Sequence, residues 1–462
     1  MRLYLDPHGC AKNQVDAEFM LSSLMAAGWE ICEDPETADL VIVNSCGFIE
    51  SAKRESIEAL LAWRDAYPGK KIMLAGCLSQ RYAADLAAEM PEVDFFFGNG
   101  DLSRVGEAVK AVMAGTERIL CPPVGDDSRE EALAAQDSAL CGSHRPILSL
   151  PGSAFLKISE GCDNRCTYCA IPLIRGGLRS RPAASILAEA RSLIGRGIRE
   201  LCLVGQDLAS YGVDRGETGS LIGLLKELLA LDGDVWIRLL YIHPDHFPRE
   251  LLPLIAEGLS RREREGPGRP YIVPYFDVPF QHASPSILRA MNRRGDAETY
   301  LALVEDIRRA VPEATIRSTF LLGFPGETEA DVEALLDFQS AARLDWLGAF
   351  SWSREEDTPA WGLKGRVAKK IAETRKRRVE EAQQPISIER MARFAGQKMD
   401  ILIEEKVEGE EGLWLGRAVC QAPEVDGSTV ITSFDELPLG GLVPCRIVRV
   451  NGFDLDAVPE RG

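Results

Sequence analysis

Three cysteines lie close together directly after an apolar run of the chain. Cys162, Cys166 and Cys169 have a Cys-x-x-x-Cys-x-x-Cys spacing, and they follow the strand-like run 154–158. Thiolates are preferred ligands of iron–sulfur clusters, and three of them on one loop can hold three irons of a cubane cluster. The fourth iron then stays open to a small molecule. The spacing therefore predicts a redox-active cluster with one open iron.

A structural zinc site or three buried cysteines are the alternatives for this triplet. Structural zinc normally takes four ligands. No fourth cysteine or histidine lies within ten residues of the triplet. The cluster is therefore the favoured interpretation.

A second set of cysteines shares one kind of position. Cys10 follows a short N-terminal strand, and Cys46 and Cys77 follow the strand-like runs 39–44 and 71–75. Each has a glycine neighbour, which lets the backbone fold closely around a bulky group. Parallel strands end at one rim of a sheet, where α/β proteins bind ligands. We therefore expect these three to hold a second cluster; three buried hydrophobic residues are the alternative.

The other six cysteines show no such convergence. Cys202 and Cys445 lie within strand-like runs and are expected in the core. No role is assigned to the six. They are Cys32, Cys121, Cys141, Cys202, Cys420 and Cys445.

Bulk composition limits the classes of protein. The chain has 462 residues, 45% hydrophobic and 27% charged, which predicts a soluble protein of two to four domains. It contains no apolar stretch of 18 residues and no signal-peptide pattern, so we expect a cytoplasmic protein without membrane contact. Its twelve cysteines then suggest metal or redox chemistry. The net charge of −18 argues against a general nucleic-acid binder and favours a basic partner.

The elements that must position these cysteines follow a β/α rhythm, so the fold class is α/β. Residues 1–115 read as a parallel-sheet α/β domain, 116–150 as a linker, and 151–363 as a partial (β/α) barrel. Residues 364–393 form a basic helical connector with ten Lys/Arg against four Asp/Glu, and 394–462 a small antiparallel β-barrel. The strands expected in the central domain are 154–158, 200–204, 235–240, 275–279, 315–322 and 347–350.

Four segments together resemble the methylthiotransferase family of radical S-adenosylmethionine (SAM) enzymes, over nearly the whole chain. They are 9–18, 161–182, 205–207 and 318–328. The resemblance implies an N-terminal cluster domain, a central radical SAM domain and a C-terminal TRAM domain. It also implies two 4Fe-4S clusters, held by the two cysteine sets, and SAM as cofactors.

Within the SAM site, the resemblance suggests roles for two loops. Gln206 and Asp207 follow a predicted strand and could contact the polar groups of SAM, with ordinary loop capping as the alternative. Gly323 and Glu327 could shape the adenosyl pocket, or form a tight turn that opens a helix. His282 is either a polar pocket residue or a structural histidine.

The family's chemistry is implied in the same way. One cluster would reduce SAM to give methionine and a 5′-deoxyadenosyl radical. This radical would abstract hydrogen from an aspartate β-carbon, the second cluster would supply sulfur, and a second SAM would supply the methyl group. Arg175, Arg179 and Arg181 could pair with the substrate carboxylate, although structural ion pairs are the equal alternative.

Three segments favour the branch of the family that modifies an aspartate of a small-subunit ribosomal protein. They are 12–16, 274–284 and 422–427. A departure from the family pattern, Asp6-Pro7-His8 before Cys10, changes no ligand. Residues 394–462 carry six Lys/Arg against thirteen Asp/Glu, a net charge of −7 that would repel RNA and suit a basic protein. The alternative is that this acidic surface merely keeps a small domain soluble.

The expected partners are therefore a basic ribosomal protein, free or within the subunit, and an electron-donor protein. Direct RNA contact is left open, because the basic segment 369–378 could touch RNA or be a solvated helix face, which is the favoured interpretation. Two other functions compete. A tRNA adenosine methylthiotransferase would share the fold but carry a less acidic last domain, and a non-catalytic iron–sulfur carrier would need no SAM pocket.

Overall fold

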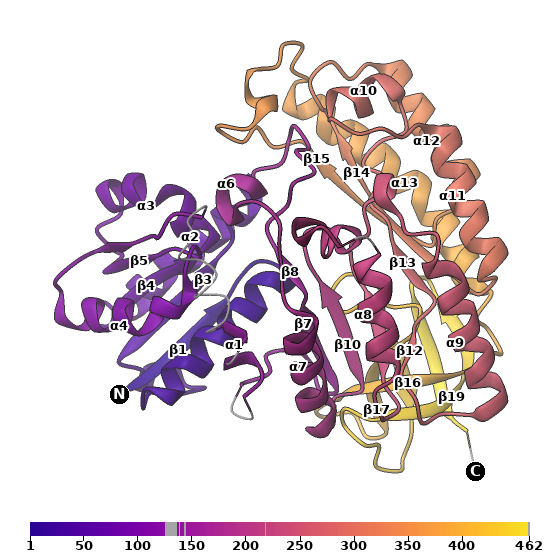
Figure 1. Cartoon of the computed structure of the whole chain (residues 1–462), viewed down its shortest axis with the longest axis horizontal. Helices are drawn as coiled ribbons and strands as arrows, with labels where there is room; N and C mark the ends of the chain where they lie inside the picture. The colour runs from indigo at the N-terminus through magenta and orange to yellow at the C-terminus, as the bar shows by residue number, and fades with distance from the viewer. Residues whose placement is uncertain (125–135, 138, 143–144, 218, 461–462) are drawn as a thin grey trace.

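The computed structural model describes residues 1–124, 136–137, 139–142, 145–217 and 219–460. Part of the predicted linker 116–150 lies outside these residues. Figure 1 shows an N-terminal α/β unit beside a larger barrel-like unit, with a small β-barrel behind the lower end of the latter.

The N-terminal unit is a six-stranded parallel sheet in the order β2-β1-β3-β4-β5-β6. Strand β3 is buried at all its positions, as expected for a parallel strand covered on both faces. Because β1 and β4 both pair with β3 in parallel, the C-terminal ends of these three strands meet at one edge. The elements are β1 (Arg2–Pro7), α1 (Ala11–Ala26), β2 (Glu30–Ile31), β3 (Leu40–Ser45), α2 (Glu50–Ala66), β4 (Lys71–Gly76), α3 (Cys77–Glu89), β5 (Phe95–Phe97), α4 (Val105–Ala114) and β6 (Ile119–Leu120).

The central unit has two parallel sheets, β12-β11-β10-β7 and β13-β14-β15. They approach one another where the Ile242 N–H donates to the Asp277 carbonyl at 2.8 Å, so together they form an open, partial barrel. The six predicted strands are confirmed, and the two-residue strands β8, β9 and β12 are additions. The elements are β7 (Ser153–Lys157), β8 (Ser159–Glu160), α6 (Ile171–Arg175), β9 (Arg179–Ser180), α7 (Ala183–Gly195), β10 (Glu200–Val204), α8 (Ser220–Leu229), β11 (Trp236–Leu239), α9 (Leu251–Glu265), β12 (Tyr271–Ile272), β13 (Tyr275–Asp277), α10 (Pro285–Ala290), α11 (Ala297–Ala310), β14 (Thr315–Leu322), α12 (Glu329–Ala342) and β15 (Trp346–Ser351).

The predicted basic connector is one long helix, α13 (Lys369–Ala392), which packs against β15 and α12. The chain then closes a five-stranded barrel in the order β16-β17-β18-β20-β19. Four of its pairings are antiparallel, as predicted, whereas β18 and β20 pair in parallel. Its strands are β16 (Lys398–Lys406), β17 (Leu413–Ala418), β18 (Thr429–Thr432), β19 (Leu442–Asn451) and β20 (Asp454–Pro459). Cys202 and Cys445 are fully buried in their strands, which confirms that both belong to the core.

A buried ion-pair network fixes the small barrel to the central unit. Glu200 of β10 accepts from Arg238 Nε at 2.7 Å and from Arg417 Nη2 at 2.5 Å, and Arg417 also pairs with Glu404 at 2.7 Å. Burial alone would raise the pKa of Glu200, but the two guanidinium groups lower it to about 2. The carboxylate is therefore charged and paired at neutral pH.

None of the helices described is long and apolar enough to cross a membrane.

Candidate active site

The central cysteine loop joins β8 to α6, at the C-terminal side of β7. Gly161 opens the loop with φ of 71°, and a Cβ there would lie 2.0 Å from the carbonyl oxygen of Gly177. Only glycine fits this position. Inside the loop, the Cys169 N–H donates to the carbonyl of Cys166 at 3.0 Å. The backbone thus holds the cysteines in a fixed arrangement.

Burial shifts the pKa values of two central cysteines. Burial raises the pKa of Cys162 to about 11 and that of Cys169 to about 12, and the negative charge of Cys166 adds to both shifts. These two thiols therefore stay protonated at neutral pH unless a bound cation stabilises the thiolate form, as a metal does for its cysteine ligands.

The donor set fits a cluster better than a single ion. Structural zinc normally takes four ligands, whereas this loop offers three thiols. A cubane instead spreads three thiolates over three separate irons. The three central thiols therefore fit an iron–sulfur cluster.

The N-terminal cysteines lie at the ends of three neighbouring strands. Cys10 is the N-cap of α1, Cys46 follows β3, and Cys77 is the first residue of α3. A Cβ at Gly9 would lie 3.3 Å from the Cβ of Cys46, and one at Gly47 would lie 2.5 Å from the carbonyl oxygen of Cys77. The structure thus brings these cysteines to one edge of the sheet, with glycines where the backbone is most crowded.

These thiols also influence one another's pKa. Burial raises the pKa of Cys46 to about 12, and the charges of Cys77 and Cys10 add to the rise. The pKa of Cys77 is likewise raised, mainly by burial. Desolvation would also raise the pKa of Cys10, but the positive charges of Lys12 and Arg175 outweigh it and lower this pKa. This donor set, too, fits a multi-iron cluster.

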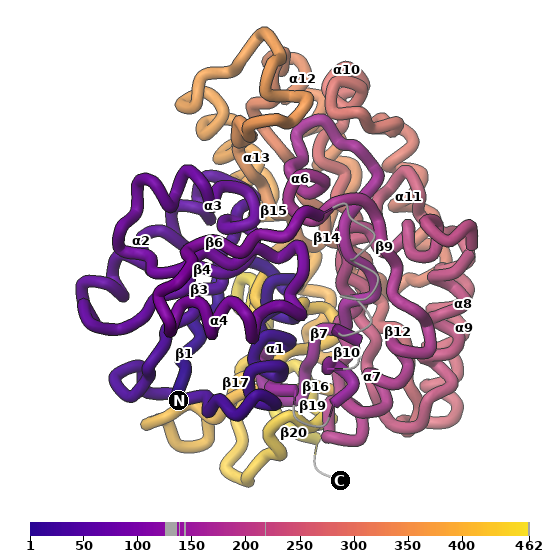
Figure 2. Tube along the Cα trace, turned by 60° about the vertical axis from the view of Figure 1, so that its left-hand side comes forward, coloured from indigo at the N-terminus to yellow at the C-terminus, as the bar shows by residue number. Residues whose placement is uncertain are grey.

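Helix α6 lies between the two cysteine sets. Cys77 packs in one small cluster with Ala170, which directly follows Cys169, and with Ile174 and the half-buried Phe48. Figure 1 shows α6 beside α3 of the N-terminal unit, and Figure 2 shows it above β15 of the barrel. The central cysteine loop therefore leads directly into a short helix that packs against Cys77 of the N-terminal set.

The arginines after the cysteine loop are engaged inside the protein. The buried Arg175 pairs with Glu160 at 2.8 Å and with Asp16 at 2.9 Å, and Arg181 pairs with Asp137 and Glu189. Of the two interpretations given by the sequence, structural ion pairing describes both residues. Arg179 lies in β9, half-buried.

Asp207 organises the cysteine loop from outside. Its carboxylate accepts from the Asn164 amide at 2.9 Å, within the cysteine loop, and from the backbone N–H of His243 at 3.1 Å. It also caps the turn that follows it, through the Ala209 N–H. Gln206 donates to Glu160 at 3.4 Å, while its buried Oε1 has no hydrogen-bond partner among the described residues. Gln206 thus offers an acceptor, and Asp207 acts through its neighbours.

Glu327 is held by its own loop and by the connector helix. Its carboxylate accepts from the Gly323 N–H at 2.9 and 3.0 Å and from Arg375 of α13 at 2.8 Å. Gly323 has φ of 76° and lies against Ala372, where a Cβ would lie 2.4 Å from the Ala372 Cβ. The buried His282 accepts two backbone N–H groups at 3.0 Å through Nδ1. These contacts give Glu327 and His282 roles in shaping the loop.

Sequence reasoning missed several residues around the central loop. His243 Nε2 lies 4.0 Å from the Cys166 sulfur, and burial, helped by Arg293 and His246, lowers the pKa of His243 to about 2. Tyr241 has a positive φ of 75°, which is strained for a tyrosine. The position of these residues after β11, a barrel strand, was the available signal.

Arg293 is the other residue that was missed. Its side chain is buried and donates through Nη1 to the carbonyls of Pro279 and Phe280. Nε and Nη2 have no partner within the described parts of the chain. Arg293 therefore brings unused donors into the region of Cys166 and Cys169. Burial alone would lower the pKa of Arg293, but the charges of Tyr168, Tyr241 and Cys166 raise it. The charge of Arg293 in turn opposes the rise in the pKa of Cys169.

The cations of α13 are mostly paired along the helix surface. Arg375 and Arg378 contact Glu327, Glu329 and Glu333 of the neighbouring segment. Within α13 itself, Lys376 and Arg377 pair with Glu380 and Glu381. This agrees with a solvated, ion-paired helix face.

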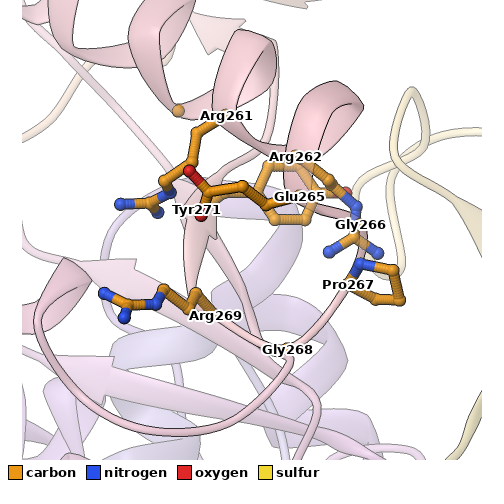
Figure 3. A pocket seen from close by; sticks show the side chains of 9 residues that line it. Arg261, Arg262, Glu265, Gly266, Pro267, Gly268, Arg269 and Tyr271 are labelled. Atoms are coloured by element: carbon orange, nitrogen blue, oxygen red, sulfur yellow. The ribbon is translucent and has the colours of Figure 1, made fainter.

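A hollow at the opposite end of the barrel is not part of this arrangement. Figure 3 shows its arginine-rich lining, from the C-terminal part of α9 to the start of β12. Parallel strands place their ligand sites at the C-terminal ends, whereas β12 only begins here. Arg262 of this lining already pairs with Asp234 and Asp400.

The chain matches three known domain families in order. Residues 2–98 match an uncharacterized protein family, UPF0004, residues 156–338 match the radical SAM superfamily, and residues 395–459 match the TRAM domain. The first match contains Cys10, Cys46 and Cys77, and the second contains Cys162, Cys166 and Cys169.

Relatives match the chain over its full length. The chain is 43% identical over 484 aligned residues to the ribosomal protein uS12 methylthiotransferase RimO of Treponema denticola. The alignment covers 98% of this chain and 100% of the relative. The proteins of the same name from Desulfosudis oleivorans and Moorella thermoacetica are 42% and 41% identical, covering 98% and 96% of this chain and 99% and 95% of the relatives.

A solved structure supports the fold. The radical S-adenosylmethionine methyltransferase TsrM from Kitasatospora setae, with cobalamin and a 4Fe-4S cluster bound, superposes with a TM-score of 0.56 at 15% identity. The match covers 78% of this chain and 73% of that one. At this identity the likeness concerns the fold alone.

Proposed function

Because the chain belongs to the ribosomal protein uS12 methylthiotransferase family, we propose that it attaches a methylthio group to the β-carbon of an aspartate in that ribosomal protein. The chain is an enzyme, a radical SAM methylthiotransferase. The observation that carries the proposal is the position of α6, which packs Cys77 of one cysteine set against Ala170, next to Cys169 of the other. A transfer that needs two metal centres requires this proximity.

An iron–sulfur cluster and SAM are the cofactors that this family entails. Our proposal is more specific: one four-iron cluster on each cysteine set, Cys162, Cys166 and Cys169 for the first and Cys10, Cys46 and Cys77 for the second. When bound, these groups supply the one-electron reduction, the hydrogen abstraction and the sulfur.

The chain's own residues hold, orient and shield these groups. Asp207 fixes the cysteine loop against the loop that carries His243. The unpartnered Oε1 of Gln206 is a buried acceptor for a donor group of SAM. Gly323 and Glu327 keep the adjoining loop against α13.

The last domain supports a protein substrate. Its net charge of −7 favours a basic ribosomal protein, free or within the subunit, over RNA. Phe434, at 82% exposure, follows β18 and is succeeded by Asp435 and Glu436. An exposed aromatic ring beside carboxylates is suited to a Lys/Arg-rich segment. We also propose a cytoplasmic enzyme that receives electrons from a donor protein.

Turnover with two substrates tests this function. Reconstituted enzyme is incubated anaerobically with SAM, a reductant and either uS12 or total tRNA. Mass spectrometry then measures the modification of each substrate. We expect a methylthio adduct on uS12 and unmodified tRNA. Modified adenosine with unmodified uS12 would favour the tRNA alternative, and failure of the reduced protein to cleave SAM would support the carrier.

A further inference from the structure

The guanidinium of Arg175 contacts a thiol of the N-terminal set. Arg175 ends α6, in the same segment as the central cysteine loop, and only 2% of it is exposed. Its Nη2 donates to the sulfur of Cys77 at 3.3 Å and to the side-chain oxygen of Asn13 at 2.6 Å. A residue of the central unit thus reaches across the interface to a candidate cluster ligand.

The surrounding charges hold this guanidinium in place. Asp16 and Glu160 each pair with Arg175, and the buried Lys157 pairs with the same two carboxylates at 2.5 and 2.7 Å. Buried ion pairs of this kind fix geometry because neither partner can leave without stranding the other's charge. The side chain is therefore rigidly directed at Cys77.

The same network extends toward the candidate SAM site. Glu160, which accepts from Arg175, also accepts from Gln206 at 3.4 Å. An unbroken series of polar contacts therefore runs from Gln206 through Glu160 and Arg175 to Cys77.

A cation that donates a hydrogen bond to a cluster thiolate has a known physical effect. Reduction adds negative charge to a cluster, and positive charge and hydrogen bonds at its sulfurs stabilise that charge and raise the reduction potential. Asn99 adds a neutral donor to the same sulfur at 3.4 Å. Cys77 is thus the ligand through which the protein can adjust an N-terminal cluster.

We propose that Arg175 is a positioning residue for the N-terminal cluster: it holds Cys77 in place and raises the reduction potential of a cluster bound by Cys10, Cys46 and Cys77. The inference rests on the proposed function, since it requires a cluster on that set. The inference adds a direct contact between the two units: the side chain of Arg175, from the central unit, binds a cysteine of the N-terminal set.

The test measures the N-terminal cluster alone. In a full-length background with C162A, C166A and C169A, the midpoint potential is determined by a redox titration followed by electron paramagnetic resonance. Arg175→Gln is expected to lower it by at least the equivalent of a tenfold change in the reduced-to-oxidised ratio, 59 mV for one electron. Arg175→Lys, which keeps the charge, is expected to give a smaller shift in the same direction.

Arg181→Gln is the matched control. Arg181 is equally buried and ion-paired in the same stretch of chain, but its recorded partners are Asp137, Glu189 and a backbone carbonyl. Both Gln variants should lower the thermal unfolding midpoint, and only Arg175→Gln should shift the potential. A folded Arg175→Gln protein that no longer retains the cluster would also support the positioning role.

Two results overturn the inference in distinguishable ways. Equal potentials for the Arg175→Gln and Arg181→Gln proteins would refute the role of Arg175 and leave the proposed function intact. A C162A/C166A/C169A background that binds no iron would refute the second cluster itself, and with it both proposals.

Discussion

Replacing Glu200 by Gln should loosen the last domain from the barrel. One pKa unit corresponds to 1.36 kcal/mol, so lowering the pKa of Glu200 from 4.5 to about 2 stabilises the folded chain by ~3 kcal/mol at neutral pH. Glu200→Gln also leaves the buried Arg238 and Arg417 with a weaker partner. We expect a total loss of roughly 3–5 kcal/mol.

Urea unfolding of Glu200→Gln at pH 7 measures this loss, with Glu405→Gln as the control. Glu405 is an exposed acid on β16, so its replacement removes the same charge at the surface and should cost less than about 1 kcal/mol. If the two variants lose equal stability, the ion-pair account is wrong.

The pH dependence gives a second check with a definite sign. The folded-state pKa is below the unfolded value, so the stability from Glu200 is present above about 4.5 and is lost as the pH falls toward about 2. The difference in the free energy of unfolding between wild type and Glu200→Gln should therefore become smaller as the pH is lowered below about 5. A difference that stays constant down to pH 3.5 would contradict the lowered pKa.

Three further predictions concern the site and the substrate. Gly161→Ala places a methyl group 2.0 Å from a backbone oxygen, so it should remove about half of the bound iron; Gly195→Ala, with open space around it, should remove none. Asp207→Asn replaces one carboxylate oxygen, which accepts hydrogen bonds, by an amide NH2 that faces other donor groups. We expect kcat to fall roughly tenfold or more while the iron content stays constant. An unchanged kcat would refute the positioning role of Asp207. Glu410 and Glu411 are exposed acids of the last domain. Replacing both by Lys should raise KM for uS12 several-fold at low salt without changing kcat, and added salt should reduce the effect. Equal KM values for the variant and the wild type would refute charge-guided docking.

The strand-end cysteines could be predicted because their signal is local. Cys46 and Cys77 each follow a short apolar run, and parallel strands bring such ends together irrespective of loop details. Glycines beside the cysteines also indicated where the backbone is crowded. A Cβ at Gly47, next to Cys46, or at Gly161, next to Cys162, would clash with a backbone oxygen.

What was missed depends on contacts between distant parts of the chain. β12 has only two residues, too few for a periodic signal. β20 does alternate Asp with apolar side chains, but only over a few residues before Pro459. The contact of Arg175 with Cys77 joins residues 98 positions apart. Nothing in the local sequence of either residue specifies that pairing.

The roles of Asp207 and Glu327 illustrate the same limit. Both were expected near SAM because they follow barrel strands. The structure gives each carboxylate several protein donors, so their part in binding SAM is proposed to be indirect. Sequence spacing locates such residues at the mouth of the barrel but does not say which way their carboxylates turn.

The iron content of three proteins tests most directly whether the chain holds two separate centres, one on each cysteine set. After anaerobic reconstitution, wild type should bind about eight irons per chain, and the C10A/C46A/C77A and C162A/C166A/C169A variants about four each. Retention of about eight irons by either variant, or loss of all iron from both, would contradict two independently held clusters.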